Sequence, residues 1–281
     1  MGRKRTQFFD SAIKNEWSYR YYKNKLFEIG MSMFKWENLP ETIDSIYLER
    51  SLFFKGAVIF FFDEDIGYLA LRGALGGPMN VYNVPQSRQP IAPGYHGPKR
   101  DGSNSVIIYN NMLRNPTAPD CEMFAYKLYN VDRTIDTNIN AQKTPVVIVC
   151  EESERLSMLN LMKDYDGNVP FIFGSKSLDL SNIKVLNTEA PFIAGELSEI
   201  KANIWNEALT HLGVPNVSIQ KRERLNRDEV NRNMGGTIAS RFCRLEPRQF
   251  ACEQINKMFG LNISVDYRDN FTMDGGEYFN E

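Results

Sequence analysis

The sequence is poor in the features that mark a membrane, secreted or metal-bound protein. Its longest apolar run, Leu52–Phe62, is interrupted by Lys55 and Gly56 and is far shorter than the ~20 residues needed to cross a bilayer. It has only four cysteines and two histidines, with no CxxC pair. A structural zinc site is therefore not expected, and the cysteines are predicted to be reduced and buried. The basic start of the chain leads into no apolar segment, so neither secretion nor a membrane partner is predicted.

Enzyme motifs are also scarce. No GxxxxGK[ST] loop is present, and the glycine-rich stretch Gly73–Gly77 lacks the lysine and hydroxyl that hold a nucleotide and magnesium. The acidic cluster Asp63–Asp65 could bind a divalent metal in a nuclease, but three acids after an apolar strand are more often its solvated end. Neither His96 nor His211 has the neighbours of a catalytic triad. We therefore predict no enzyme activity, no metal site and no cofactor.

The composition is that of a folded chain with an uneven charge distribution. Hydrophobic residues make up 42% of its 281 positions, enough for one large or two modest domains. Residues 1–25 hold seven basic side chains against two acids, and residues 221–248 hold eight against four. Because the net charge of the chain is −2, the remainder carries −11. Two basic zones on an acidic body can contact a polyanion locally without binding it everywhere.

Two long helices are predicted in the first half of the chain. The first has a cap at position 10 or 11 and continues to about Phe34, with Trp17, Tyr21 and Leu26 buried. The second begins after Thr117, where a hydroxyl, a first-turn proline and an acid are all favourable, and ends before residue 143. Its apolar stripe consists of Phe124, Leu128, Val131, Ile135 and Ile139.

A third long helix is predicted over residues 190–212. One broad arc of it is apolar, and the opposite face carries Glu196, Glu199, Asn203 and Glu207. Lys201 lies inside the apolar arc, where a lone charge is costly in a monomer core. An oligomer that places Lys201 at a subunit boundary or opening would remove this cost.

Two regions between the helices have the pattern of short strands. The first has strands at 57–62, 67–71 and 106–109, with loops rich in glycine and proline at 73–78 and 90–98. The second has strands at 145–150, 169–173 and 183–186 and a short helix at 156–163. The fold class is therefore α+β, with the β parts forming a lateral domain and the helices forming a stalk.

The end of the chain is predicted to alternate between loop and helix. The basic segment 220–240 has no sustained periodicity and is predicted to be a mobile loop. Pro247 and Gly260 bracket a last helix, and residues 274–277 are predicted to be disordered. Without further context, the basic segment is an ordinary solvated loop or a nucleic-acid contact.

Short stretches spread over nearly the whole chain resemble one protein family. They are Arg3–Arg5, Trp36–Pro40 with Thr42-Ile43, Gly73–Leu75, Val81–Asn83, Val106–Asn111, Asn140–Val146, Gly167-Asn168 with Pro170, Thr188 with Ala190-Pro191, Trp205–Glu207, Glu223-Arg224 with Asp228–Val230, Cys252-Glu253 with Ile255-Asn256, and Gly260–Asn262. In this order they resemble the portal proteins, also called connector or upper collar proteins, of the protein-primed, short-tailed phages that infect Gram-positive bacteria. The stretch Met234-Gly235-Gly236 and several additional arginines depart from that pattern.

The resemblance implies a ring of twelve subunits around a DNA channel. It assigns residues 1–24 to a basic arm and the start of the first helix, 25–117 and 144–187 to a wing with a small SH3-like barrel, 118–143 and 188–214 to stem helices, 219–240 to a tunnel loop, and 241–281 to a crown helix and tail. The tunnel-loop residues expected to contact DNA are Lys221, Arg222, Arg224, Arg227 and Arg232. The expected channel lining is Glu196, Glu199, Asn203 and Glu207, together with Lys201.

The resemblance also implies partners and a location. The arm residues Arg3, Lys4 and Arg5 are expected to face the packaging machinery, and some relatives bind a packaging RNA there. The expected partners are double-stranded DNA, major capsid and scaffolding proteins, a packaging ATPase, and lower collar or tail proteins. The expected location is the portal vertex of the virion, and the host cytoplasm during assembly. The alternative is a nucleic-acid-binding tail or scaffold-type structural protein without a channel.

Overall fold

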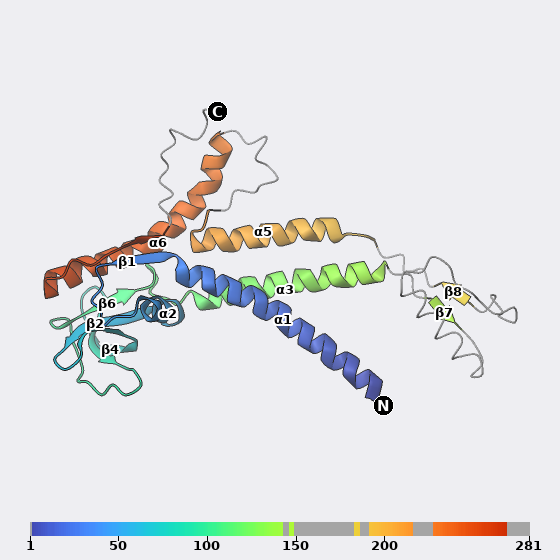
Figure 1. Ribbon diagram of the computed structural model, residues 1–281. Helices are drawn as coiled ribbons and strands as arrows, with labels where there is room; N and C mark the ends of the chain where they lie inside the picture. Colours follow the sequence, from blue (N-terminus) through green and yellow to red (C-terminus); the bar gives the residue numbers. More distant parts are fainter. Residues whose placement is uncertain (1, 143–145, 149–182, 186–190, 216–226, 269–281) are drawn as a thin grey trace. The chain divides into compact units, whose positions relative to one another are not determined.

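The computed structural model describes residues 2–142, 146–148, 183–185, 191–215 and 227–268. The chain divides into two compact units, residues 1–130 with 201–281 and residues 131–200. The elements, labelled in Figure 1, are α1 Gly2–Ser32, β1 Phe34–Glu37, α2 Ser45–Lys55, β2 Ala57–Asp63, β3 Gly67–Leu71, β4 Gly73–Met79, β5 Pro85–Pro90, β6 Ser105–Tyr109, α3 Ala118–Ala141, β7 Val146–Ile148, β8 Ile183–Val185, α5 Ala194–Leu212, α6 Arg227–Phe259 and β9 Ser264–Tyr267. The mixture of long helices and short strands confirms the α+β class.

Helix α1 begins earlier than predicted. It starts at Gly2, so the cap expected at position 10 or 11 is wrong. The first 32 residues contain no proline to stop a helix before those positions. Leu26 is fully buried as predicted, but Trp17 and Tyr21 are 66% and 58% exposed. Their aromatic character indicated burial, which the fold of the single chain does not provide.

Helix α2 was not predicted, although the sequence holds both of its end signals. The Asp44 carboxylate accepts from the backbone N–H of Ile46 at 2.8 Å, and Gly56 ends the helix in the left-handed region, at φ 80°. A Cβ at Gly56 would lie 2.8 Å from the Arg114 carbonyl oxygen. The apolar run Leu52–Phe62 concealed this boundary because it spans the helix end and the next strand.

The main sheet has the antiparallel strand order β3-β2-β6. Its strands confirm the three predicted at 57–62, 67–71 and 106–109. Strand β2 is buried on both faces: Val58 and Phe60 join one core, whereas Ile59 and Phe61 join a smaller cluster on the other side. No barrel closes among the strands that the structure describes, so the small SH3-like barrel is not found there.

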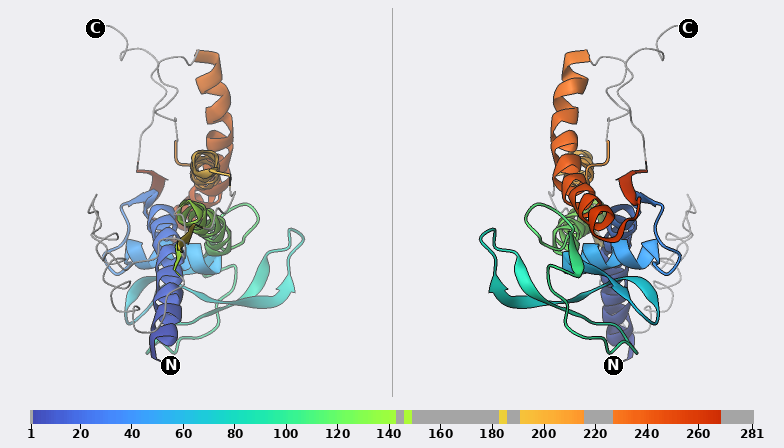
Figure 2. Two further views of the ribbon diagram at one scale, coloured as in Figure 1. Left: turned by 90° about the vertical axis from the view of Figure 1, so that its right-hand side faces the viewer. Right: turned by 90° about the vertical axis from the view of Figure 1, so that its left-hand side faces the viewer.

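A β4–β5 hairpin stands out beside this sheet and replaces part of a predicted loop (Figure 2). Its turn is held by the Asn80 side chain, which accepts from the N–H groups of Tyr82 and Val84, both at 2.9 Å. At Gly73 a Cβ would lie 2.4 Å from the carbonyl oxygen of Gln89. Glycine is therefore required at the start of β4, and here it marks a close strand pairing and not a loop.

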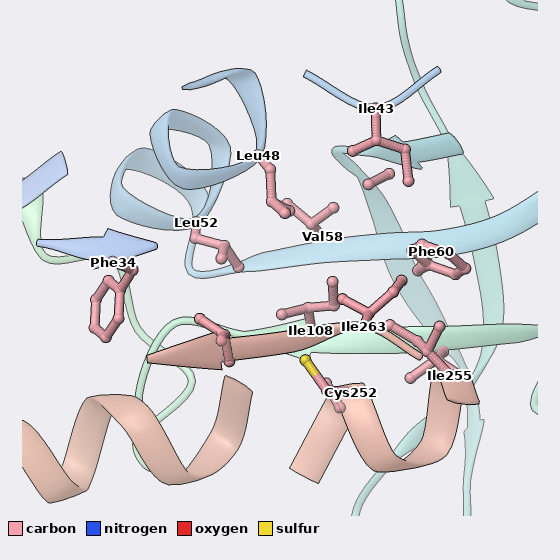
Figure 3. Packing of buried hydrophobic residues seen from close by; sticks show 14 of the residues in the cluster. Phe34, Ile43, Leu48, Leu52, Val58, Phe60, Ile108, Cys252, Ile255 and Ile263 are labelled. Atoms are coloured by element: carbon pink, nitrogen blue, oxygen red, sulfur yellow. The ribbon is translucent and has the colours of Figure 1, made fainter. Parts of the chain in front are cut away.

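The principal core lies where α2, the sheet, α6 and β9 meet. Leu48 and Leu52 point from α2 toward Val58 of β2 (Figure 3). From α6, Ile255 is fully buried in the same cluster. Strands β1 and β9, which are distant in sequence, pair antiparallel and add Phe34 and Val265 at its edge.

A second core joins α1, α2, α3 and α5 within the first unit. It contains Leu26, Phe53, Phe124, Leu128 and Leu212. The beginning of α3 thus packs against the end of α5, so the two helices run antiparallel here. Helix α3 ends at Ala141, as predicted. Its apolar stripe is only partly covered, because Phe124 and Leu128 are buried whereas Ile139 is 44% exposed.

The second unit contains the far part of α3, the first turns of α5 and the antiparallel pair β7–β8. The amide of Asn138 links the two helices: it donates to the carbonyl of Pro191 at 2.8 Å and accepts from the N–H of Ile193 at 3.0 Å. Helix α5 begins at Ala194 and not at 190, the position expected from sequence. The helix expected at 156–163 and the strand expected at 169–173 lie outside the described residues.

Helix α6 corrects the loop prediction for residues 227–240. It runs unbroken from Arg227 to Phe259, so Pro247 lies inside it and does not start it. A proline here leaves the carbonyl of Cys243, four residues earlier, without its helical partner. That carbonyl instead accepts from the N–H of Met112 at 3.1 Å. A contact from a distant loop therefore lets the helix continue through the proline.

Candidate functional site

The acidic face of α5 is exposed along the helix. Glu196, Glu199, Asn203 and Glu207 follow one another at intervals of three, four and four, and all four are exposed. They therefore form one continuous polar strip, as the sequence predicts. Such a strip produces a negative field along one side of the helix.

The opposite face of α5 is covered unevenly. Ala208 and Leu212 are buried in the second core, and Ile204 and Trp205 pack against it. Nearer the start of the helix the burial is mixed: Ala194 is buried and Leu197 is partly buried, but Ile200 is 46% exposed, and Phe192, just before the helix, is 67% exposed. Part of the apolar arc is thus left exposed by the single chain.

Lys201 does not need a subunit boundary to offset its charge. Its ammonium lies 5.5 Å from the ring centroid of Tyr22 on α1, and the side chain is half-buried. This cation–π contact places Lys201 beside α1 and away from the acidic strip. Lys201 was expected at a subunit boundary because its charge was predicted to be unpaired in the core. That reason is wrong, because Lys201 is only half-buried and contacts Tyr22.

The structure does not describe the side chains of the basic candidates. Lys221, Arg222 and Arg224 lie outside the described residues. Arg227 and Arg232 lie on the first turns of α6, and Arg3, Lys4 and Arg5 lie on the first turns of α1. All five are thus on helical backbone and not on a loop or an extended arm.

A buried ion pair on α6 was missed at the sequence level. Arg248, 1% exposed, pairs with Glu49 through Nη2–Oε2 and Nε–Oε1 distances of 3.0 and 3.1 Å. Trp36 Nε1 donates to the same carboxylate at 2.8 Å. The guanidinium also lies 3.9 Å from the ring centroid of Phe34. The count of basic residues placed Arg248 in an exposed polyanion-binding zone, because a count does not distinguish buried charges from surface charges.

A second polar cluster joins α3, α5 and α6. Nε2 of His211 lies 3.1 Å from Oδ2 of Asp120 and 3.1 Å from Nη2 of Arg244. One nitrogen cannot donate to the carboxylate and accept from the guanidinium at once. Burial, followed by the charge of Arg244, lowers the pKa of His211, against the opposing effect of Asp120. Neutral His211 can accept from Arg244 or donate to Asp120 through Nε2, according to its tautomer, whereas protonated His211 can only donate.

The other candidate reactive groups have structural surroundings. Asp63 accepts from the Tyr95 hydroxyl at 2.8 Å, a hydrogen bond that lowers the pKa of the carboxyl group. Burial raises the pKa of Cys121 and of Cys252 to about 12. These two cysteines are buried as predicted, whereas Cys243 is exposed. Within the described ranges, no three His, Cys, Asp or Glu side chains are grouped to hold a metal.

Among the helices that the structure describes, none combines the length and the apolar character required to span a membrane.

Comparisons with known proteins give one matching family model and several similar structures. A sequence model described as "Phage Connector (GP10)" matches residues 4–272. A chain in the portal and tail of native bacteriophage P68 is similar in structure, with TM-score 0.51 and 19% identity over 95% of this chain and 91% of that one. The HK97 family phage portal protein from Corynebacterium diphtheriae gives TM-score 0.43 and 11% identity, covering 89% and 91% of the two chains. A chain of the native gene transfer agent virion gives 0.46 and 12%, covering 91% and 80%.

Proposed function

Because this chain belongs to the phage connector (GP10) family and is a portal, or connector, subunit, we propose that twelve copies close into a ring around a channel for double-stranded DNA. The uneven cover of α5 supports ring formation. Ile200 on its apolar arc is 46% exposed, and Phe192, just before the helix, is 67% exposed. A neighbouring subunit would cover this surface in a closed ring.

The exposed acidic strip of α5 carries the proposed mechanism. If α5 faces the bore, Glu196, Glu199, Asn203 and Glu207 repeat around the duplex. Carboxylates repel phosphates, so this wall gives DNA no adhesive surface as it slides. The basic residues of segment 219–240 would supply a few weak attractive contacts, which release counterions when they meet phosphate.

The proposed role includes a location and a set of partners. We assign the ring to the portal vertex of a virion, assembled in the host cytoplasm, of the protein-primed short-tailed phage type. Its partners there are major capsid and scaffolding proteins, lower collar or tail proteins, and a packaging ATPase. The basic residues Arg3, Lys4 and Arg5 make the start of α1 the surface for the packaging machinery or a packaging RNA.

The chain itself is proposed to be structural and without catalysis. The connector family is a family of structural proteins, and the sequence has no phosphate-binding loop. The force that moves DNA would then come from the separate ATPase. ATP hydrolysis or DNA cleavage by the purified chain, lost on changing Asp63 or Asp65 to alanine, would contradict this assignment.

Imaging of the purified protein tests the ring directly. Native mass spectrometry is expected to give a closed oligomer of twelve 32.4 kDa chains, and negative-stain images should show a central hole wide enough for duplex DNA. A monodisperse monomer across micromolar concentrations would contradict the channel and favour a tail or scaffold-type protein instead.

A further inference from the structure

A groove of the first unit lies between the β4–β5 hairpin, strand β6 and the outer face of α6. It consists of two adjoining hollows, the smaller enclosing about 360 Å³. The residues that line both hollows are Val84, Arg88, Arg114, Phe250 and Gln254. The centre of the groove therefore presents two arginines and an aromatic ring, with no carboxylate among the shared lining residues.

Arg88 is the unusual member of this set. Its side chain is 94% buried, and it donates to the carbonyl oxygens of Pro85 and Ser105 and to the Ser105 hydroxyl. No carboxylate of the described residues lies within ion-pair distance of it, whereas Arg248, which is also buried, pairs with Glu49. The Asp101 carboxylate attracts the charge of Arg88 without forming an ion pair with it, so Arg88 can still attract a further anion from outside.

Arg114 reinforces this attraction from the exposed side of the groove. It lies over the ring of Tyr109 at 4.7 Å, and it donates to the carbonyl of Asn83 at 2.8 Å. Lys257 adds a further exposed cation in the larger hollow. Two acids line the outer parts: Glu246 is exposed, and the Asp101 carboxylate already accepts from the N–H and hydroxyl of Ser103.

Apolar surface and an open strand edge complete the groove. Phe250 is 60% exposed and Met112 is 48% exposed, both well above a packed core residue. Strand β6 is an edge of the described sheet β3-β2-β6, so its outer backbone is not paired with a strand there. Cations, an exposed aromatic and a free strand edge together suit an extended acidic peptide that carries aromatic side chains.

We propose that the groove binds residues 269–281 of this chain. The segment holds four acids, three aromatics and no basic residue, which matches the arginines and Phe250. It follows directly on Arg268, the residue after β9. Its 13 residues reach about 43 Å when extended.

Disulfide cross-linking in the full chain tests the proposal. Cys243 and Cys150 are replaced by serine, Asn280→Cys places a thiol in the segment, and Met258→Cys places another in the groove, where Met258 lines the larger hollow. A comparison variant keeps Cys243, which is exposed on the same helix, and the native Met258. Mild oxidation should link Asn280→Cys to Met258→Cys at least about fivefold faster than it links Asn280→Cys to Cys243 in the comparison variant. Electrophoresis separates a link within one chain from a link between two subunits.

Groove variants distinguish docking from chance collision. Phe250→Ser should slow the cross-link about tenfold, since it removes the exposed ring that the docked segment would cover. Arg114→Glu should slow it similarly, with partial recovery when Glu277→Arg is added. The control Phe242→Ser removes an equally exposed aromatic of α6, 58% against 60%, and should leave the rate unchanged. Circular dichroism checks that each variant is folded.

Two results would overturn the proposal. One is equal cross-linking at Met258→Cys and at Cys243, with no effect of Phe250→Ser or Arg114→Glu. The other is competition by a short DNA duplex whose own binding depends on Arg114 and Lys257 but not on Phe250. That result would assign the groove to phosphate, because a duplex backbone offers charge without an aromatic to bury.

Discussion

At the scale of single residues, the most consequential features are buried charges. Arg248 and Glu49 are 1% and 4% exposed and form a bidentate pair that also involves Trp36. Burying two charges costs free energy that the pair regains only when both partners are present. Nothing in the local sequence distinguishes Arg248 from the exposed arginines of the same region. Its partner lies 199 positions away, so the pair becomes visible only when the fold brings α2 and α6 together.

Arg248→Ala should therefore lower the free energy of unfolding by about 3–5 kcal/mol, since Glu49 is left buried without a counter-ion. The double change Arg248→Met with Glu49→Leu should be much milder, because it removes both charges and keeps the volume. Urea unfolding followed by circular dichroism measures both. Arg20→Ala is the matched control: its pair with Glu16 is exposed, and its loss should cost under about 1 kcal/mol. Equal effects of Arg248→Ala and Arg20→Ala would rule out this account.

His211 should make the stability sensitive to acid. Its pKa in the folded chain lies below 6.5, mainly because of burial and Arg244. The unfolded chain therefore binds more protons between the folded value and 6.5, and the free energy of unfolding falls as pH drops below about 6.5. His211→Gln should reduce this loss, whereas changing the exposed His96 to Gln should not. Denaturation midpoints at pH 7.5 and 5.5 for the three proteins provide the comparison.

At the scale of elements, periodicity predicted the long helices better than their ends or their neighbours. The stripe of α3 and the acidic strip of α5 were both found, because each depends on residues within one helix. The pairing of β1 with β9 was missed, since it joins segments more than 220 positions apart. The course of α6 through Pro247 was missed for a similar reason: the group that satisfies the carbonyl of Cys243 belongs to Met112.

The acidic strip of α5 leads to a prediction about DNA. Reversing Glu196, Glu199 and Glu207 to lysine should leave ring assembly intact, because the three side chains are exposed. The ring should then bind duplex DNA more tightly at low salt, and log K should fall more steeply with log salt as more counterions are released. Reversal of the exposed Glu41, Glu64 and Glu253 is the control for total charge. Similar binding by both triple variants would indicate that α5 does not face DNA.

At the scale of the whole molecule, the distribution of charge matters more than its sum. The net charge of −2 conceals two basic zones, and the structure divides one of them further. Arg244 and Arg248 of the second zone are buried, so they are not available to a polyanion. The charges left for DNA are therefore those toward residue 221, which lie at or before the start of α6. The sequence could predict the zone, but only the fold divides it into buried and available parts.

Changing Lys221, Arg222, Arg224 and Arg227 to alanine should leave ring assembly intact and let packaging begin normally. Filled heads should then lose DNA, and the loss should increase with ionic strength as the remaining contacts are screened. DNA retained per head, measured against salt, checks this. Heads of the quadruple variant that hold their genome as well as the parent would show that these residues do not grip DNA.

The proline within α6 has a mechanical consequence. Before Pro247, Arg244 contacts His211 of α5, and Arg241 donates to the carbonyl of Gly213 at 2.7 Å. After it, Arg248 forms an ion pair with Glu49 of α2. Figure 1 shows that the helix changes direction along its length. Contacts thus hold α6 on both sides of Pro247. Because the proline removes a helical hydrogen bond, the bending stiffness of the helix is reduced between these contacts. We therefore expect α6 to bend most easily near Pro247, between the two sets of contacts.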